Sequence, residues 1–202
     1  MEITKHNNFY IELFELYSIA IKAARHLCDT STNGKIAPSA TFEELAALSL
    51  EAFVKAREHF ANGGIKTDIA DEMYSLASKL LELTTKISAL PRLCEIYGVK
   101  APTEYMCESI MKIAMMCEDL LDTVIVDGAG LLQFDIERVG KIHLTCSGHK
   151  IHCAAEISKL FKTCPSTISA LIMKDILEEI CTIYEIITQI LGISLVISLR
   201  SS

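Results

Sequence analysis

Apolar residues recur at intervals of three and four along most of this chain, and that spacing places them on one face of an α-helix. In the first such stretch the repeat includes Phe9, Leu13, Leu16 and Leu27. Glycine, proline and small polar residues separate one stretch from the next. We therefore expect long helices over residues 6–29, 41–60, 68–97, 103–126, 134–164 and 168–197. No stretch favours a β-strand to a comparable degree, so the sequence predicts an all-α protein built from six long helices.

Local patterns predict where several of these helices begin and end. Thr41 is followed three residues later by Glu44, which is a capping-box pattern for the start of the second helix. Glycines at residues 62–64 and 127–130 are expected to end the second and fourth helices. Pro91 lies inside the apolar repeat of the third helix and predicts a kink or a break there. Where the resulting loops are short, adjacent helices are expected to pack antiparallel.

The order of the helices predicts a single domain, residues 1–202, made of two three-helix halves. A segment that contains Gly98 and Pro102 lies at the midpoint, so the halves cover about 1–98 and 103–202. They share helix number and order but little direct sequence identity, and the repeat is therefore architectural. Half of the 202 residues are hydrophobic, so the chain can bury a substantial core without disulfides or structural metals.

Charge and cysteine content indicate a cytoplasmic protein and argue against nucleic acid as a partner. The formal net charge is −7, whereas nucleic-acid-binding domains carry a basic surface. The first residues lack the basic segment and apolar run of a secretion signal. The eight cysteines include no CxxC pair, and we expect them to be reduced thiols in a helical core.

The most apolar tract of the chain, residues 180–199, is expected to be a buried terminal helix. Glu185 and Gln189 interrupt its first part, and Gly192 divides it. The apolar run that remains, residues 193–199, is too short to cross a bilayer. The sequence therefore predicts that the protein does not span a membrane.

The fifth predicted helix carries the residues best suited to bind a metal ion. The candidates are His143, Cys146, His149 and Cys153. Their spacing of three, three and four places them within an arc of about 120° on one helix face, together with Phe161 further along. Imidazole and thiolate groups bind divalent metals such as zinc, but one ion reaches only two ligands at such spacing, so Cys181 and Glu185 of the sixth helix are candidates for the others. In the alternative interpretation the stripe is packing, with cysteines as small core residues and histidines at boundary positions.

The sequence offers no pattern typical of an enzyme. None of the six histidines has a carboxylate three residues before it, which excludes the Glu-x-x-His motif of di-iron helical bundles. The glycine clusters do not match the phosphate-binding patterns GxxxxGK[ST] or GxGxxG. A cysteine near His143 or His149 would be a nucleophile only with an oxyanion hole, and long uninterrupted helices leave few loops to build one. We therefore expect a binding protein without catalytic activity.

Methionines are frequent on the fourth predicted helix, which carries Met106, Met111, Met115 and Met116. Methionine adapts to irregular gaps in a core, and exposed methionines adapt equally well to the surface of a partner. Core filling is the commoner role. The sequence leaves core filling and a partner-binding groove as the two interpretations of this set.

Three stretches of the chain resemble the PhoU-like family, and in particular its branch of accessory proteins associated with Pit-type phosphate transporters. The opening stretch resembles that branch's first helix and reads FYIELFELYSIAIKAARHL. The stretch that resembles its third helix reads TDIADEMYSLASKLLELTTKI. The tail resembles its last loop and closing helix, reads SKLFKTCPSTISALIMKDILEEICTIYEIITQILGISL, and includes the recognisable fragment Lys174, Asp175 and Ile176.

This resemblance implies a PhoU-like bundle that regulates phosphate transport or phosphate signalling without catalysis. Its implied partner is a membrane phosphate transporter or sensor, met at the cytoplasmic face of the inner membrane, and a homodimer is compatible with it. Family members often bind metal clusters through E-x-x-x-D or D-x-x-x-D motifs. In this sequence none of the matching pairs is acidic at both positions. The pairs are Glu51 with Lys55, Glu82 with Lys86, Thr145 or Cys146 with His149 or Lys150, and Cys181 with Glu185. No metal-binding residue is therefore carried over from the family.

Overall fold

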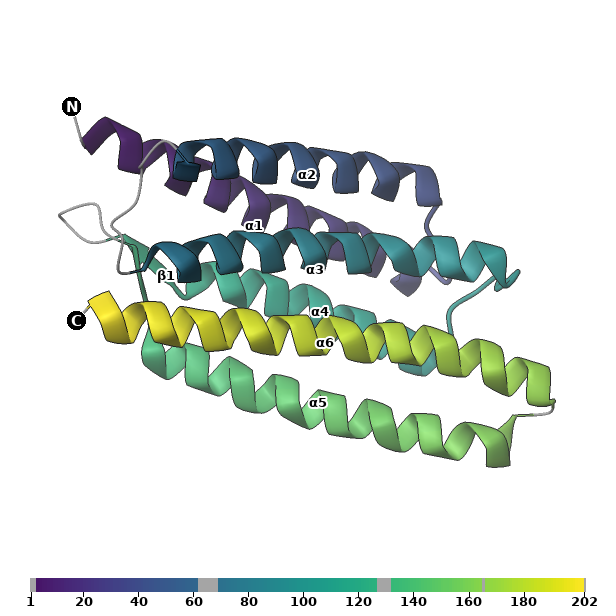
Figure 1. Ribbon diagram of the computed structural model, residues 1–202. Helices are drawn as coiled ribbons and strands as arrows, with labels where there is room; N and C mark the ends of the chain where they lie inside the picture. Colours follow the sequence, from purple (N-terminus) through teal and green to yellow (C-terminus); the bar gives the residue numbers. More distant parts are fainter. Residues whose placement is uncertain (1–2, 62–68, 127–131, 165, 202) are drawn as a thin grey trace.

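The computed structural model describes residues 3–61, 69–126, 132–164 and 166–201, and within them the prediction of an all-α bundle of six long helices is confirmed (Figure 1). The helices are α1 (Ile3–Thr32), α2 (Ser39–Ala61), α3 (Ala70–Ile96), α4 (Glu104–Asp122), α5 (Ile136–Thr163) and α6 (Thr167–Ser201). One short hairpin joins α4 to α5 and consists of β1 (Val124–Val126) and β2 (Leu132–Phe134).

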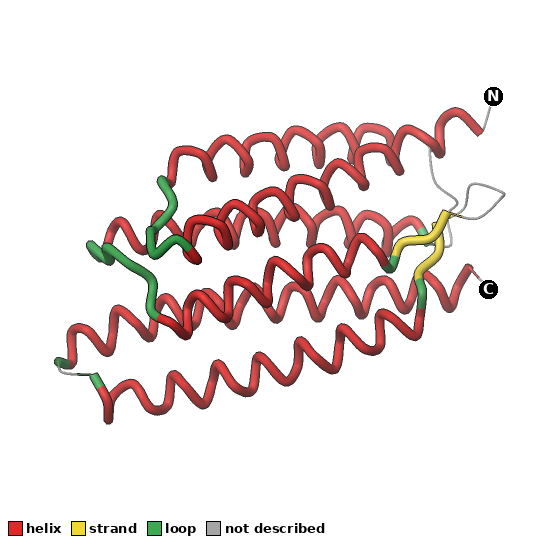
Figure 2. The backbone as a smooth tube through the Cα atoms, turned by 180° about the vertical axis from the view of Figure 1, so that it is seen from behind, coloured by secondary structure: helices red, strands yellow, loops and turns green. Residues whose placement is uncertain are grey.

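The helices lie lengthwise beside one another, with α2 and α5 at opposite edges of the bundle (Figures 1 and 2). Helix α1 contacts α2, α3 and α4, while α6 contacts α3, α4 and α5. The first three helices also contact one another, as do the last three, and the two sets meet where α1 packs on α4 and where α3 packs on α6. Buried side chains from all six helices form one hydrophobic core. The most peripheral helix of the second set, α5, is attached chiefly to α6.

The hairpin corrects the predicted ends of the fourth and fifth helices. The prediction extended the fourth helix to residue 126, but α4 ends at Asp122, and residues 124–126 pair antiparallel with residues 132–134. The β-branched run Val124, Ile125 and Val126 explains the change, because such side chains favour the extended backbone of a strand. Phe134 was predicted to begin the fifth helix but lies in β2, where Ser198 of α6 hydrogen bonds to its backbone. The predicted glycine end at residues 127–130 lies outside the described residues.

Helix α5 begins where Asp135 supplies a side-chain cap. The Asp135 carboxylate accepts a hydrogen bond from the backbone N–H of Arg138 at 3.0 Å. The Asp135 N–H donates to the carbonyl of Thr123 at 2.8 Å, which ties this cap to the end of α4. The Arg138 guanidinium also forms an ion pair with Asp122. Because these bonds join both sides of the hairpin, the position of α5 is set partly by groups of α4.

The start of α2 and the course of α3 differ from the sequence prediction. Helix α2 begins at Ser39, so Thr41 lies inside the helix and the predicted capping box does not mark its start. Instead, the carboxylate of Glu95, at the end of α3, accepts a hydrogen bond from the Ser39 N–H at 3.0 Å. That bond lowers the pKa of Glu95, because it favours the ionised form. Helix α3 continues through Pro91 without a break. The predicted glycine end at residues 62–64 lies outside the described residues.

Helix α6 is continuous from Thr167 to Ser201, so Gly192 does not divide it as the sequence argument assumed. By length and composition alone, its residues Thr167–Arg200 could cross a membrane. Half of its most apolar window is buried inside the bundle. Ile183, Ile187 and Ile190 of this helix are fully buried. Length therefore does not exclude a membrane span, and what the structure shows is that α6 supplies much of the core.

Truncation of a core residue should destabilise the fold far more than truncation of an equally large surface residue. Leu80 of α3 is fully buried, whereas Leu144 of α5 is 74% exposed. Leu80→Ala is expected to lower the free energy of unfolding by about 2–5 kcal/mol, because it removes packed methyl groups and leaves a cavity. Leu144→Ala is expected to change it by no more than about 0.5 kcal/mol. Urea unfolding followed by circular dichroism measures both values, and equal losses in the two variants would contradict the assignment of the core.

Candidate functional site

The histidine and cysteine stripe of α5 faces α6 and is divided between buried and partly exposed positions. Cys146 and Cys153 are fully buried, while His143 and His149 are partly exposed. Phe161 was predicted on the same stripe. It is 56% exposed, so the prediction that it faces the core is wrong. The two cysteines of the stripe therefore lie in the core, and its two histidines lie at the boundary between core and surface.

Cys146 has contacts that suit a packing residue. Its thiol donates a hydrogen bond to the backbone carbonyl of Tyr184 at 3.0 Å, and the Thr188 hydroxyl donates to its sulfur at 3.4 Å. Burial raises the pKa of the Cys146 thiol, since the thiolate is poorly solvated in the core. A protonated thiol bonded to a helix carbonyl is a poor metal ligand, because metals bind the thiolate.

Cys153 belongs to a second cluster, which sequence reasoning only partly identified. Its thiol donates to the carbonyl of Leu177 at 3.4 Å, and it lies against the thiol of Cys181 on α6 and the phenol of Tyr105 on α4. Hydrogen bonds from Cys181 and Tyr105 stabilise the thiolate of Cys153 and lower its pKa, while the same contact raises the pKa of Cys181. The sequence analysis named Cys181 as a candidate metal ligand. It did not identify Tyr105, because Tyr105 lies on α4 and no periodic pattern connects it to α5.

His149 and His152 pack at a tilt against tyrosine rings. The His149 ring lies 5.8 Å from the Tyr184 ring, and the His152 ring lies 5.5 Å from the Tyr105 ring. Burial lowers the pKa of His149, and the nearby ammonium of Lys112 lowers it further. His149 is therefore held neutral as a packing group at the edge of α5.

The four candidate residues do not converge on one metal position. Among the described residues, no group of three or more histidine, cysteine, aspartate or glutamate side chains is arranged to hold a metal ion. Of the two candidate donors on α6, Cys181 contacts Cys153, and Glu185 forms an ion pair with Lys150 at 3.5 Å. The donor set predicted for a divalent metal therefore does not fit one in this arrangement.

Lys55 and Lys86 form ion pairs with acidic residues. Lys55 of α2 pairs with Glu51 on the same helix at 2.9 Å. Lys86 of α3 reaches across to Glu179 of α6 at 3.1 Å, and both side chains are partly buried. This second ion pair links α3 to α6.

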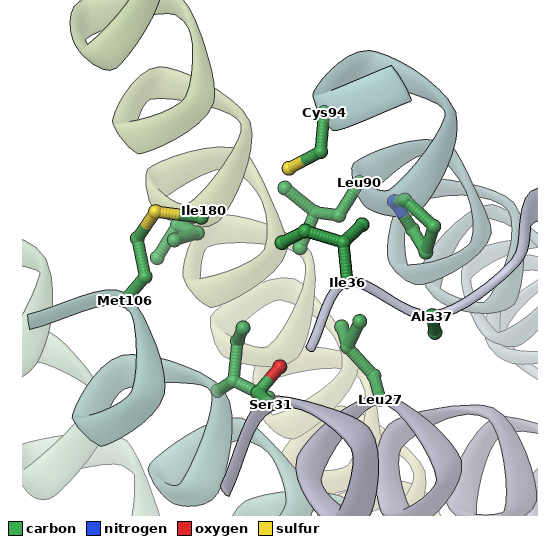
Figure 3. A pocket seen from close by; sticks show the side chains of 10 residues that line it. Leu27, Ser31, Ile36, Ala37, Leu90, Cys94, Met106 and Ile180 are labelled. Atoms are coloured by element: carbon green, nitrogen blue, oxygen red, sulfur yellow. The ribbon is translucent and has the colours of Figure 1, made fainter. Parts of the chain in front are cut away.

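An enclosed hollow lies where the ends of α1, α3 and α4 meet α6 (Figure 3). It is lined by Leu27, Ser31, Ile36, Ala37, Leu90, Pro91, Cys94, Met106, Ile110 and Ile180. Its volume for a water-sized molecule is about 10 Å³. That is room for about one water molecule, so this hollow is a packing gap and does not hold a substrate.

A scan against protein-family models finds no match to this chain, and no curated protein matches it. The resemblance to the PhoU-like family therefore depends on the sequence stretches that carry it.

Purified protein prepared without added metal should contain no stoichiometric zinc or iron, because the thiols of Cys146 and Cys153 are bonded to α6 carbonyls and the candidate ligands do not converge on one position. Elemental analysis by mass spectrometry measures this content. The double variant Cys146→Ala/His149→Ala should show the same background as the wild type. One equivalent of metal per chain that disappears in the double variant would contradict this reading.

The stability of the fold should fall in mild acid partly because of His149. Its pKa is lowered in the folded state, so the unfolded chain binds a proton that the folded chain does not. The contribution of neutral His149 is therefore present above the unfolded pKa of about 6.5 and is lost as pH falls below it. Thermal unfolding at about pH 7.5 and about pH 5.5 should show a larger drop in midpoint for the wild type than for His149→Gln. Equal drops would contradict the assignment.

Proposed function

We propose that this protein is a non-catalytic accessory protein that regulates phosphate transport or phosphate signalling by docking to a membrane phosphate transporter or sensor. The support has two parts, namely the PhoU-like resemblance of three helical stretches and an exposed apolar pair on the outermost helix of the second set. The fold fits a binding role, because its long helices present continuous outer faces.

The observation that carries the docking surface is the exposure of Leu144 and Ile151. They are 74% and 72% exposed, and their separation of seven residues places them on the same face of α5. Each precedes a buried cysteine by two positions, which is about 200° around the helix, so they face away from α6. A partner that covers these two large aliphatic side chains removes their apolar surface from water, and this burial stabilises the complex.

The surroundings of this pair suit a reversible contact with another protein. Charged side chains flank the two residues along α5, including the ion pair of Lys141 with Glu137 at 2.8 Å and that of Lys150 with Glu185. An apolar centre with a charged margin is the usual composition of a protein–protein interface. The proposed contact places α5 against the cytoplasmic face of the transporter or sensor, with α6 as the support behind it.

In cells that make this protein, deletion of its gene should alter phosphate uptake or the phosphate-starvation response. A wild-type copy should restore both, and Leu144→Gln/Ile151→Gln should fail to restore them while it folds normally, because glutamine keeps the helix and removes the apolar contact. Uptake of radiolabelled phosphate and a starvation-responsive reporter measure the outcome.

The matched control is Ile96→Gln/Leu199→Gln, which removes two equally exposed aliphatic side chains, 68% and 72%, from the ends of other helices. This control should restore uptake as the wild type does. Unchanged uptake and signalling after deletion would overturn the proposed function. Failure of both double variants would overturn the assignment of α5 as the docking surface.

A further inference from the structure

The last turn of α5 and the first turns of α6 carry large apolar side chains that are exposed to solvent. Phe161 is 56% exposed, Ile168 is 71% exposed and Leu171 is 48% exposed. Lys162, next to Phe161 in the last turn of α5, is exposed as well. These four residues form the tip of the α5–α6 pair. The tip lies at the end of the bundle opposite both chain termini (Figures 1 and 2).

The two helix ends that make up the tip lie close together. Phe161 of α5 and Ala170 of α6, the neighbour of Leu171, line one shallow hollow between them. The apolar side chains of the two helices therefore belong to one surface. Exposed apolar surface of this kind marks a site that another molecule or a membrane covers.

Charge is distributed unevenly along this chain, and the tip lies in its basic part. Residues 138–174 contain six basic residues and one acidic residue, so their formal net charge is +5. The whole chain has a net charge of −7, which leaves −12 for all other residues. The six basic residues are Arg138, Lys141, Lys150, Lys159, Lys162 and Lys174. Salt screens charges beyond about 8–10 Å, so a surface that meets the tip interacts with these lysines more than with the distant acids.

We propose that the tip inserts into the headgroup layer of an anionic lipid bilayer. Phe161, Ile168 and Leu171 enter the boundary between headgroups and acyl chains, where their apolar surface leaves water. The ammonium group of Lys162 stays at the level of the lipid phosphates. Basic charge beside exposed aliphatic and aromatic side chains is the composition of a segment that binds such a surface. This contact needs no protein partner, so it does not depend on the proposed role in phosphate transport.

The nearby lysines are available to lipid headgroups. Lys159 forms an ion pair with Glu156 at 2.6 Å, and Lys174 forms one with Glu178 at 2.7 Å. Pairs at an exposed surface contribute little to stability and hold long side chains weakly. Both ammonium groups can therefore turn to lipid phosphates at little cost.

The depth of interfacial insertion matches the length of both helix ends that lacks acidic residues. Interfacial segments enter the bilayer by about 5–10 Å, which is at most about seven helical residues at about 1.5 Å each. About seven residues back from the end of α5 reach residue 157, and about seven from the start of α6 reach residue 173. The nearest acidic residues are Glu156 and Asp175, just beyond these limits. No carboxylate therefore has to enter the bilayer.

The α5 surface proposed to dock on a transporter remains outside the bilayer in this arrangement. Ile151 precedes Phe161 by ten residues and Leu144 precedes it by seventeen, which are about 15 Å and about 26 Å along the helix. With the tip in the lipid, α5 rises from the membrane and its outer face is free to meet a neighbouring protein. Lipid binding and protein docking should therefore be separable by substitution.

Flotation of the full-length protein with lipid vesicles tests the proposal. The wild type should float with vesicles of equal parts phosphatidylglycerol and phosphatidylcholine, and it should not float with phosphatidylcholine alone. The bound fraction should fall between about 0.05 M and about 0.5 M salt, because salt screens the lysines. Absence of binding, or equal binding to both kinds of vesicle, would overturn the proposal.

Substitutions in the tip should weaken binding to the anionic vesicles. Phe161→Gln/Ile168→Gln/Leu171→Gln should raise the apparent Kd more than about tenfold, because three apolar contacts are lost. Lys162→Glu should raise it at least about fivefold, since one attractive charge becomes repulsive. Circular dichroism checks that both variants keep the helical fold.

Matched controls are exposed residues far from the tip. Ile11→Gln/Leu50→Gln/Leu199→Gln removes three exposed aliphatic side chains from α1, α2 and the other end of α6, and Lys22→Glu reverses an exposed charge on α1. Both should change the apparent Kd less than about twofold, because these positions do not meet the bilayer. Equal losses in the tip variants and the controls would overturn the assignment of the tip.

Insertion can be followed directly, because the chain contains no tryptophan. In Phe161→Trp the emission should shift to shorter wavelength on addition of the anionic vesicles, and lipids with brominated acyl chains should quench it. In Leu144→Trp the emission should not change. Flotation without a shift at residue 161, or with an equal shift at residue 144, would overturn the proposed insertion.

The proposed docking to a transporter fails or holds independently of these results. Leu144→Gln/Ile151→Gln should bind the vesicles as the wild type does, because this pair lies outside the bilayer. Loss of vesicle binding in this variant would overturn the arrangement proposed for the tip. Unchanged phosphate uptake after gene deletion, with the vesicle results as expected, would overturn the proposed function and leave lipid binding in place.

Discussion

The apolar surface of α6 is the constraint on which the rest of this bundle depends. Three other helices cover it, since α6 contacts α3, α4 and α5. Its isoleucines at 176, 180, 183, 187, 190 and 197 are all completely buried. Each such side chain contributes about 1.5–3 kcal/mol when it leaves water. A helix with this composition is stable in water only when its neighbours exclude solvent from it, and their placement follows from that requirement.

Polar contacts with α6 then orient the helices that cover it. The buried hydroxyl of Tyr184 donates to the carbonyl of Ser109 on α4 at 3.1 Å. The hydroxyl of Tyr97, after the end of α3, donates to Asp175 near the start of α6. Apolar burial is not directional, whereas these hydrogen bonds have defined geometry, and a buried donor without a partner is costly. They therefore select one arrangement among those that bury the same apolar area.

Sulfur plays a packing role along α5. The thiols of Cys146 and Cys153 both donate to carbonyls of α6, which lets α5 lie close to its neighbour without a large side chain between them. A stripe of histidine and cysteine looks like a metal site in the sequence, but its two buried thiols are bonded to carbonyls of α6.

The sequence by itself determined the helix count and most of the apolar face of each helix, because these depend on local periodicity. It also placed Cys181 on the helix that faces α5. It did not determine the cap of α2 by Glu95, the hairpin after α4, or the meeting of Tyr105 with Cys153 and Cys181. Those features join residues far apart in the chain, and the free energy that decides them comes from packing across helices. Tertiary structure alone therefore showed that, among the described residues, the candidate metal ligands of α5 do not converge on one ion position.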